Sequence, residues 1–256
     1  MVQAGIACLP LGRTSGLDDW VGEELRLWPP PLVVGLSDLL GRVEELGRWP
    51  DGLQGAEVVL LAKPGGDPSD PMDRRPLNML SVVYRLWARL RRTAVAAWRA
   101  EWDPAVAAAR LGAAGQAWEL AWASAVAAAN GDDFGGLAVD LRKAYDSVRL
   151  GLTVRFLQAA RWPAGLLGPL AAAYSAPRRL RVAGALGPRW VAASGVPAGC
   201  PLAVDVLAVL SWAWAAALRG LAAPPVSRRY VDDLTARSAG PRATVAETVT
   251  ATWDLT

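Results

Sequence analysis

Four stretches of the chain have apolar residues with turn residues beside them and are predicted to contain short β-strands. The first runs into Pro64-Gly65-Gly66, and the second runs into Asp140. The third alternates along its length and predicts a hairpin, and the fourth, which contains "YVDD", predicts a strand, a turn and a second strand. The four stretches are residues 58–62, 137–139, 178–192 and 227–238.

Helical periodicity dominates the rest of the chain. An Arg-Arg-Pro entry at residues 74–76 leads into Leu80, Val83, Leu86 and Leu90, whose spacing predicts a long amphipathic helix. A Gly/Pro-rich turn, "SGVPAGCP", leads into another long apolar helix, and a break at Gly240-Pro241 precedes a short final one. Further helices are expected at residues 37–46, 104–129 and 143–160. Strands and helices in this mixture predict an α+β fold.

The composition excludes several classes of active site and metal site. Hydrophobic residues make up 53% of the 256 positions, which is enough for a large core, and the net charge of +3 permits a polyanionic partner. There is no histidine, so His-based triads and His-metal sites are excluded, and two cysteines cannot build a zinc site. Only Lys63 and Lys143 are lysines. With Ala, Gly, Pro and Trp also abundant, the arginine bias indicates GC-rich coding.

The sequence gives no sign of export or membrane insertion. No basic region followed by an apolar run stands at the N-terminus, so we expect no signal peptide. The longest strongly apolar uncharged stretch, residues 206–218, is short for a membrane span and suits a buried helix. We therefore expect an intracellular protein with no membrane partner.

Three carboxylates carry the chemical argument. Asp140 ends an apolar strand, and Asp232 and Asp233 stand at the tip of the last hairpin, so they converge if the strands are neighbours in one sheet. Three clustered carboxylates repel one another unless a cation neutralises them. Magnesium suits such a site, and two Mg²⁺ ions can activate a hydroxyl and stabilise a leaving pyrophosphate. Taken alone, the Asp-Asp pair reads equally well as a helix cap or a solvated turn, since pairs recur at residues 18–19 and 132–133.

Several motifs, in order, resemble those of reverse transcriptases of the non-LTR (LINE-type) retrotransposon family. They are "LAKPGGDPSDPMDRRPLNMLSVVYRLWARL", "VDLRKAYDSV", "SGVPAGCPLA" and "YVDD", and they cover residues 58–238. Asp232 follows Asp140 by 92 residues, with the Gly-rich turn between them. The resemblance implies RNA-directed DNA polymerase activity on an RNA template, a DNA primer and deoxynucleoside triphosphates, in the nucleus or cytoplasm.

The resemblance also implies residue roles. Asp140 and Asp232 resemble the principal ligands of two Mg²⁺ ions, with Mn²⁺ as an alternative, Asp233 resembles the supporting acid, and the Leu141 carbonyl would complete one site. Tyr145 lies where its ring would sit under the nucleotide sugar and exclude a 2′-hydroxyl. The positions implied for the rest of the nucleotide pocket are Lys63 and Arg75 on the triphosphate, with Pro197, Ala198 and Gly199 in the turn that lines it.

In architecture the resemblance implies a right-hand polymerase fragment with a small antiparallel palm sheet and helices on one face. We expect fingers at about residues 57–130 and palm at about 131–256, while residues 1–56 have no readable role. With 23 residues after Asp233, a thumb is expected to be missing. Two departures stand out: Ala198 replaces a family Gln, and Asp205 interrupts an apolar helix.

Two alternatives to an active polymerase stay open. One is a catalytically inactive remnant that keeps the fold and binds nucleic acid through its arginines. The other is an Ala/Trp-rich helical interaction protein whose acids are incidental and lie apart. For the Trp residues of the helices, including Trp118 and Trp122, core packing is favoured over base stacking.

Overall fold

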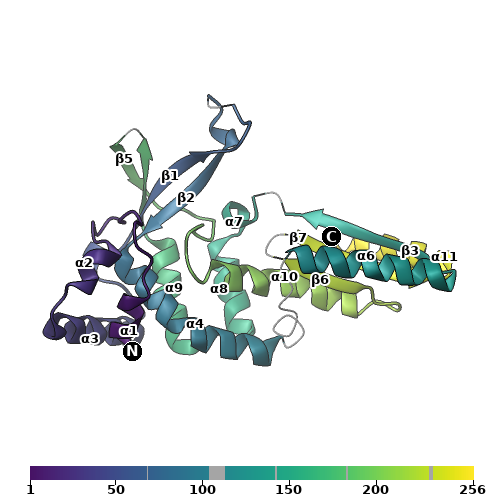
Figure 1. Cartoon of the computed structure of the whole chain (residues 1–256), viewed down its shortest axis with the longest axis horizontal. Coiled ribbons are helices and arrows are strands. Elements are labelled where there is room, and N and C mark those ends of the chain that lie inside the picture. Colours follow the sequence, from purple (N-terminus) through teal and green to yellow (C-terminus); the bar gives the residue numbers. More distant parts are fainter. Residues whose placement is uncertain (68, 104–112, 142, 183, 231–232) are drawn as a thin grey trace. The chain divides into compact units, whose positions relative to one another are not determined.

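A computed structural model describes residues 1–67, 69–103, 113–141, 143–182, 184–230 and 233–256 (Figure 1). Over these residues the chain forms ten α-helices and two separate open sheets, so the expected α+β class is confirmed. The chain divides into two compact units, and each unit draws on two separate stretches of sequence. Unit 1 comprises Met1–Trp98 and Tyr145–Ala203, and unit 2 comprises Arg99–Ala144 and Val204–Thr256.

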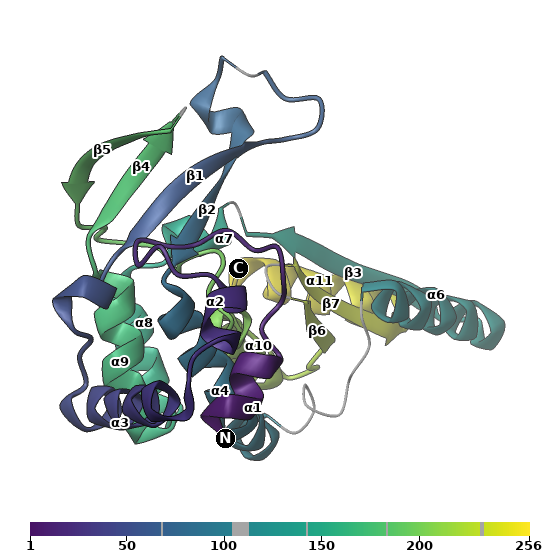
Figure 2. The same cartoon turned by 60° about the vertical axis from the view of Figure 1, so that its left-hand side comes forward.

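Unit 1 holds a four-stranded sheet in the order β2-β1-β4-β5. Two antiparallel hairpins, β1–β2 and β4–β5, meet through parallel pairing of β1 with β4 (Figure 2). The stretch at the Arg-Arg-Pro sequence, expected as the entry to a helix, is instead the strand β2, whose Pro76 is tolerated because β2 lies at the sheet edge. The strands are β1 (Ala56–Ala62), β2 (Arg74–Leu80), β4 (Arg178–Val182) and β5 (Ala185–Trp190).

The helices of unit 1 bury a core of aromatic rings. Trp87 and Tyr84 on α4 are almost fully buried, and Trp49 packs edge-on against both of them. The indole of Trp49 donates to the carbonyl of Pro169 in α9, and α9 packs beside α3 and α8. The helices with residues in unit 1 are α1 (Val2–Ala7), α2 (Gly22–Arg26), α3 (Pro30–Leu46), α4 (Val82–Trp102), α7 (Ala144–Ser147), α8 (Leu150–Ala159) and α9 (Ala164–Ser175).

Unit 2 is built on a three-stranded antiparallel sheet in the order β3-β7-β6. Its strands are β3 (Asp133–Asp140), β6 (Val226–Tyr230) and β7 (Asp233–Gly240), and its helices are α6 (Ala113–Asn130), α10 (Ala203–Arg219) and α11 (Arg242–Asp254), with the last turn of α4. The register puts Leu234 and Ala236 on one face, where both are buried and where α11 packs over Gly135. Asp140, Asp233 and Arg237 lie on the opposite face.

Helices lie on both faces of this sheet, whereas the sequence predicted them on one. Arg229 points to the α11 face and donates to the carbonyl of Ala208 in α10, so α10 and α11 share that face. Glu119 of α6 contacts Arg228 and Arg237, so α6 covers the face that carries Asp140. Figure 1 shows the sheet between α6 and α11.

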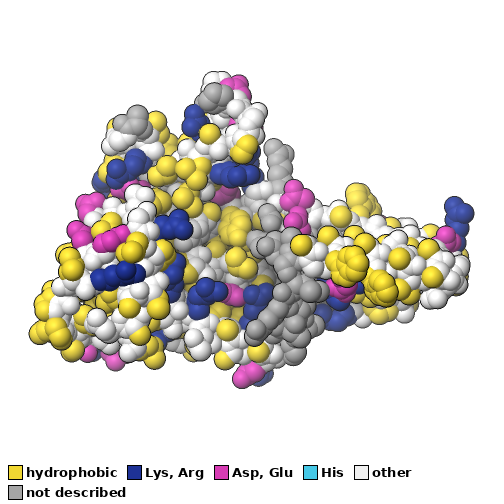
Figure 3. Space-filling view, in the orientation of Figure 1, with side chains coloured by type: hydrophobic (Ala, Val, Ile, Leu, Met, Phe, Trp, Pro, Cys, Tyr) yellow, Lys and Arg dark blue, Asp and Glu magenta, His cyan; other side chains and the backbone are white. Residues whose placement is uncertain are grey.

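Two of the tryptophans expected in the core are exposed. Trp118 and Trp122 on α6 are 71% and 62% exposed, because the buried side of this helix is the one that carries Glu119. Hydrophobic side chains accordingly line the visible face of α6 (Figure 3). Among the described helices, none is both long enough and apolar enough to cross a bilayer.

Ion pairs join the helices of unit 2 to its sheet. Arg229 of β6 pairs with Asp103, which follows α4, and both side chains are only 7% exposed. Asp205, whose place in an apolar helix requires a partner, is held by the Arg99 guanidinium at 2.8 Å. Arg229, Asp103 and Asp205 are therefore each paired with an opposite charge, which offsets the cost of their burial.

We expect the Arg229→Met variant to lower the free energy of unfolding by about 3–5 kcal/mol, because it leaves Asp103 buried without its guanidinium. Urea denaturation measures the change, with Arg242→Met, at an exposed position of α11, as the matched control. The paired change Arg229→Met with Asp103→Leu should recover most of the loss. A cost no larger than that of Arg242→Met would contradict this account of the pair.

Candidate functional site

The last residue of β3 and the first residue of β7 form a carboxylate pair. Asp140 lies directly opposite Asp233 in the antiparallel register. The sequence predicted that these acids converge if their strands are neighbours, and for Asp140 and Asp233 this is confirmed. Asp232, the third predicted carboxylate, lies outside the described residues.

The geometry of this pair is unfavourable without a counter-charge. Side chains directly opposite on an antiparallel pair have Cβ atoms about 4.5–5.5 Å apart, and like charges there destabilise the sheet. Both carboxylates are exposed, and neither forms a salt bridge within the described part of the chain. Carboxylate oxygens are ligands that hard divalent cations prefer. No group of three or more potential metal ligands occurs among the described residues, which exclude Asp232.

A cavity of about 340 Å³ adjoins the pair. Asp140, Asp233 and Thr235 line it from the sheet, and Gln116 and Leu120 line it from α6. Two arginines, Arg228 and Arg237, complete the polar part of its wall. The cavity is therefore a mixed-charge space between the sheet and one helix of the same unit.

Glu119 holds α6 over this cavity. Its carboxylate accepts from Arg228 Nε at 3.0 Å and from Arg237 Nη2 at 2.8 Å. The hydrogen bond from Arg228 is the main cause that lowers the pKa of Glu119, aided by the charges of both arginines, while burial acts in the opposite direction. Sequence reasoning missed this residue, although it is the one charged side chain within the helix at residues 113–130.

Leu141 follows the carboxylate strand directly. Its side chain is exposed, and its backbone carbonyl accepts from the Ala144 amide at 3.1 Å. A carbonyl oxygen has a second lone pair, so this hydrogen bond leaves it able to coordinate a cation.

The predicted triphosphate ligands lie on the β1–β2 hairpin of unit 1. Arg75 pairs with Leu61 in the register. Lys63, two residues after Leu61, donates its amide to the carbonyl of Asp73. Because side chains two residues apart point to the same side of a strand, Lys63 and Arg75 lie on one face. Arg75 is exposed. Lys63 is engaged, since its Nζ donates to the Met72 carbonyl at 2.9 Å and lies 3.8 Å from the Asp73 carboxylate.

The predicted turn at residues 195–199 is fixed by backbone contacts within unit 1. The Ala198 carbonyl accepts from the Asn78 amide of β2 at 2.8 Å, and the Tyr145 carbonyl accepts from the Val196 amide at 2.6 Å. Gly199 has φ +114°, and a Cβ there would lie 2.6 Å from the Asn78 carbonyl oxygen, so only glycine fits. The hydrogen bond from the Val196 amide joins the backbone of Tyr145 to the turn.

The predicted site residues thus fall into two sets. The carboxylates Asp140 and Asp233 and the Leu141 carbonyl belong to unit 2. The nucleotide set belongs to unit 1 and comprises Lys63, Arg75, Tyr145, Pro197, Ala198 and Gly199. Their roles stay predictions.

The other Asp-Asp pairs have structural explanations. The Asp18 carboxylate accepts from the Val82 amide at 2.8 Å and so caps α4 from a distant part of the chain. Asp133 begins β3 at the opposite end from Asp140. The pair that includes Asp233 differs from both, because one of its members faces another acid across the sheet.

Comparison with known proteins gives a distant and partial similarity to RNA-directed DNA polymerases of mobile elements. The chain is 27% identical over 85 residues to the probable RNA-directed DNA polymerase from transposon BS of Drosophila melanogaster. It is 28% identical over 85 residues to the RNA-directed DNA polymerase from mobile element jockey of the same organism. Each match covers 33% of this chain and 9% of the length of the relative. No family model matches the chain.

The ion pairs of Glu119 predict a specific pH dependence. A lowered pKa means that the stabilisation is present above the ordinary value of 4.5 and is lost as the pH falls below it. We expect the difference in free energy of unfolding between wild type and Glu119→Gln to be largest near neutral pH and to close below about pH 4.5. Urea denaturation over a pH series measures it.

Glu101→Gln, at an exposed position of α4, is the matched control and should show no such closing difference. If the difference in free energy of unfolding between wild type and Glu119→Gln stays constant from pH 7 to acid, the ion pairs of Glu119 do not hold α6 in place.

Proposed function

We propose that this chain carries the active-site region of an RNA-directed DNA polymerase, which transfers deoxynucleotides to the 3′-hydroxyl of a DNA primer on an RNA template. The observation that carries the proposal is the direct pairing of Asp140 with Asp233 across β3 and β7. The ordered motifs of the sequence and the partial similarity to two such polymerases support it. In this proposal unit 2 contains the palm sheet.

The residues present fit a divalent cation. Two exposed carboxylates face each other on one side of a sheet, and the Leu141 carbonyl follows directly in the chain. In the proposal Asp140, Asp233 and Asp232, with that carbonyl, hold two Mg²⁺ ions or, in their place, Mn²⁺. Such ions, when bound, favour attack by a hydroxyl and stabilise the charge of a leaving pyrophosphate. The protein contributes rigidity, because both ligands of known position are fixed by one strand register.

On the substrate side the proposal assigns roles to charge and shape. Lys63 and Arg75, on one face of a hairpin, bind the triphosphate as cations, and Arg75 can do so through two parallel hydrogen bonds. The ring of Tyr145 lies under the sugar and rejects a 2′-hydroxyl. Pro197, Ala198 and Gly199 form the wall of the pocket, where the missing side chain of glycine allows close approach of the backbone.

A non-catalytic nucleic-acid-binding remnant is the second candidate. Two observations favour it: α6 lies on the same sheet face as the carboxylates, and Ala198 stands where the related polymerases have a glutamine. The interaction-protein alternative is weakened, because it predicts scattered acids while Asp140 and Asp233 are neighbours.

We expect Asp140→Asn and Asp233→Asn to abolish Mg²⁺-dependent extension of a DNA primer on an RNA template. The asparagine side chain keeps the shape but removes the charge that offsets a bound cation. Asp133→Asn is the matched control, because it removes an exposed carboxylate at the opposite end of β3. Titration of bound Mn²⁺ by electron paramagnetic resonance gives a second readout, in which only the first two variants lose binding.

Extension that persists in Asp140→Asn would refute the metal site. Absence of extension in wild type, with RNA binding retained, would favour the non-catalytic candidate.

Tyr145 makes a separate prediction on sugar selectivity. Tyr145→Ala should raise incorporation of ribonucleotides relative to deoxynucleotides, because the ring that meets the 2′-hydroxyl is gone. Tyr145→Phe keeps the ring and should keep the wild-type ratio. Competition between the two substrates in one primer-extension reaction measures that ratio. Equal ratios in wild type and Tyr145→Ala would rule out the gate.

A further inference from the structure

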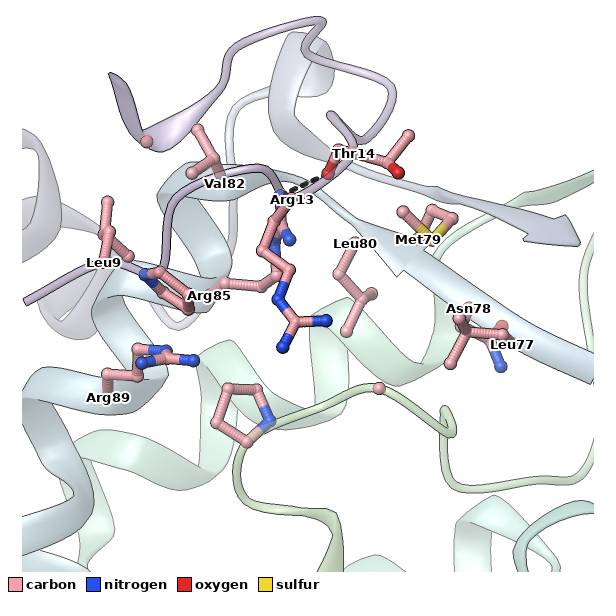
Figure 4. A pocket seen from close by; sticks show the side chains of 14 residues that line it. Leu9, Arg13, Thr14, Leu77, Asn78, Met79, Leu80, Val82, Arg85 and Arg89 are labelled. Atoms are coloured by element: carbon pink, nitrogen blue, oxygen red, sulfur yellow. Dashed lines mark hydrogen bonds between the residues drawn. The ribbon is translucent and has the colours of Figure 1, made fainter. Parts of the chain in front are cut away.

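A second cavity lies within unit 1. Its volume is about 300 Å³. The loop at residues 9–14 forms one wall, the first turns of α4 another, and the end of β2 and the turn at Gly199 close the rest (Figure 4).

Three arginines from two segments converge on this cavity. Arg13 comes from the N-terminal loop, and Arg85 and Arg89 lie one turn apart on α4 (Figure 4). None of the three forms a salt bridge within the described residues. Among the other described arginines of unit 1, Arg42, Arg91 and Arg181 have carboxylate partners.

Arg85 is the most constrained member of the cluster. Its Nη2 donates to the Thr14 carbonyl at 3.0 Å, while its Nε is buried without a hydrogen-bond partner among the described residues. Burial is the main cause that lowers the pKa of Arg85, and the charges of Arg89 and Arg13 lower it further. The three cations therefore repel one another across the cavity.

One carboxylate, that of Asp18, acts on Arg85, and its Oδ1 is buried without a hydrogen-bond partner among the described residues. Asp18 attracts Arg85, and its other oxygen accepts from the amides of Val82 and Val83 at the start of α4. Three guanidinium charges against this one carboxylate leave a surplus of two positive charges around the cavity. One doubly charged anion, or two singly charged anionic groups of one ligand, would balance it.

The remaining walls suit an anion with an organic part. Leu80, Val82 and Pro201 are apolar, and in a poorly solvated space an ion pair is stronger than in water. Asn78 also lines the cavity; it is 5% exposed, and its side-chain oxygen is buried without a partner among the described residues. Since the oxygen and nitrogen of an amide exchange on rotation, Asn78 can offer a donor there. The volume also exceeds what one tetrahedral oxyanion fills.

We propose that this cavity, the Arg13–Arg85–Arg89 pocket, binds a phosphate group that belongs to a nucleotide or to a polynucleotide strand. Arginine presents a planar fork that matches phosphate oxygens in pairs. The proposal uses none of the carboxylates of unit 2, so it can be tested independently of polymerase activity.

The test uses the full chain and a short fluorescein-labelled single-stranded RNA, with binding followed by fluorescence anisotropy. Arg13→Gln and Arg89→Gln should each raise the dissociation constant about tenfold, the effect of losing one charge-assisted hydrogen bond. The logarithm of the RNA association constant falls linearly with the logarithm of the salt concentration. Each variant should make this fall less steep by about 0.7, the value per phosphate contact on a single strand. Arg92→Gln, on the same helix but away from the cavity, should leave both unchanged.

Arg85 is left intact, because its hydrogen bond to Thr14 holds the N-terminal loop. Circular dichroism and thermal melting check that each variant folds, and Arg89→Lys, which keeps the charge and loses the fork, should fall between wild type and Arg89→Gln. If Arg89→Gln does not fold, Arg13→Gln and Arg89→Lys still decide the outcome.

Competition at constant ionic strength identifies the source of the phosphate. Displacement of the RNA by a deoxynucleoside triphosphate, more strongly than by inorganic phosphate, indicates a nucleotide ligand. Displacement by unlabelled RNA alone indicates a phosphodiester of the strand. The proposal is overturned if Arg13→Gln and Arg89→Gln bind like Arg92→Gln, or if wild type binds neither RNA nor triphosphate at low salt. If Asp140→Asn loses polymerase activity but keeps the wild-type affinities for RNA and triphosphate, the result supports a phosphate site in this pocket that is separate from the carboxylates.

Discussion

Unit 2 depends on the antiparallel pairing of β3 with β7. Eight residue pairs join strands that are separated by 92 residues of chain, and closing so long a loop has a real entropic cost. Burial of Leu234 and Ala236 beneath α11 offsets that cost. A register shift by one residue would turn this apolar face away from α11 and toward the side that α6 covers. The same shift would separate Asp140 from Asp233, so one constraint fixes both the core and the carboxylates.

A large part of the chain between these strands belongs to the other unit. Residues 145–203 complete unit 1, where they supply the β4–β5 hairpin and the Gly-rich turn, while residues 99–144 and the C-terminal part build unit 2. Neither unit is a continuous piece of sequence. The motif order along the chain therefore alternates between units, and the candidate residues for metal and for nucleotide belong to different ones.

Much of the fold follows from local pattern. The hairpins at residues 178–192 and 227–238 and the strand ending at Asp140 are predicted from apolar residues with turn residues beside them, and the structure has strands at all three. Residues 74–80 form a strand where a helix entry was expected, because pairing with β1 outweighs the local signal. The helix expected at residues 143–160 is interrupted where Arg149 bridges to Ser194.

The candidate site was predictable only in part. The carboxylate pair could be found because each acid ends or begins a strand. The attachment of α6 could not, because the partners of Glu119 lie 109 and 118 residues away and no local period encodes them. Exposure of Trp118 and Trp122 follows from that attachment, since the two ion pairs of Glu119 turn its side of the helix toward the sheet. The arginine pocket was missed for the same reason, as Arg13 and Arg89 are neighbours only after folding.

The arginine bias of the chain has a consequence for how this sequence can change. Glu57 accepts hydrogen bonds from both Nε and Nη2 of Arg181. Glu119 accepts hydrogen bonds from Nε and Nη2 of Arg228. A lysine carries the same charge but offers a single nitrogen on a flexible stem, so it cannot make these paired contacts. Replacement of arginine by lysine is usually the mildest exchange of a basic residue. At such positions it would lose the paired hydrogen bonds. The paired contacts themselves therefore require arginine there.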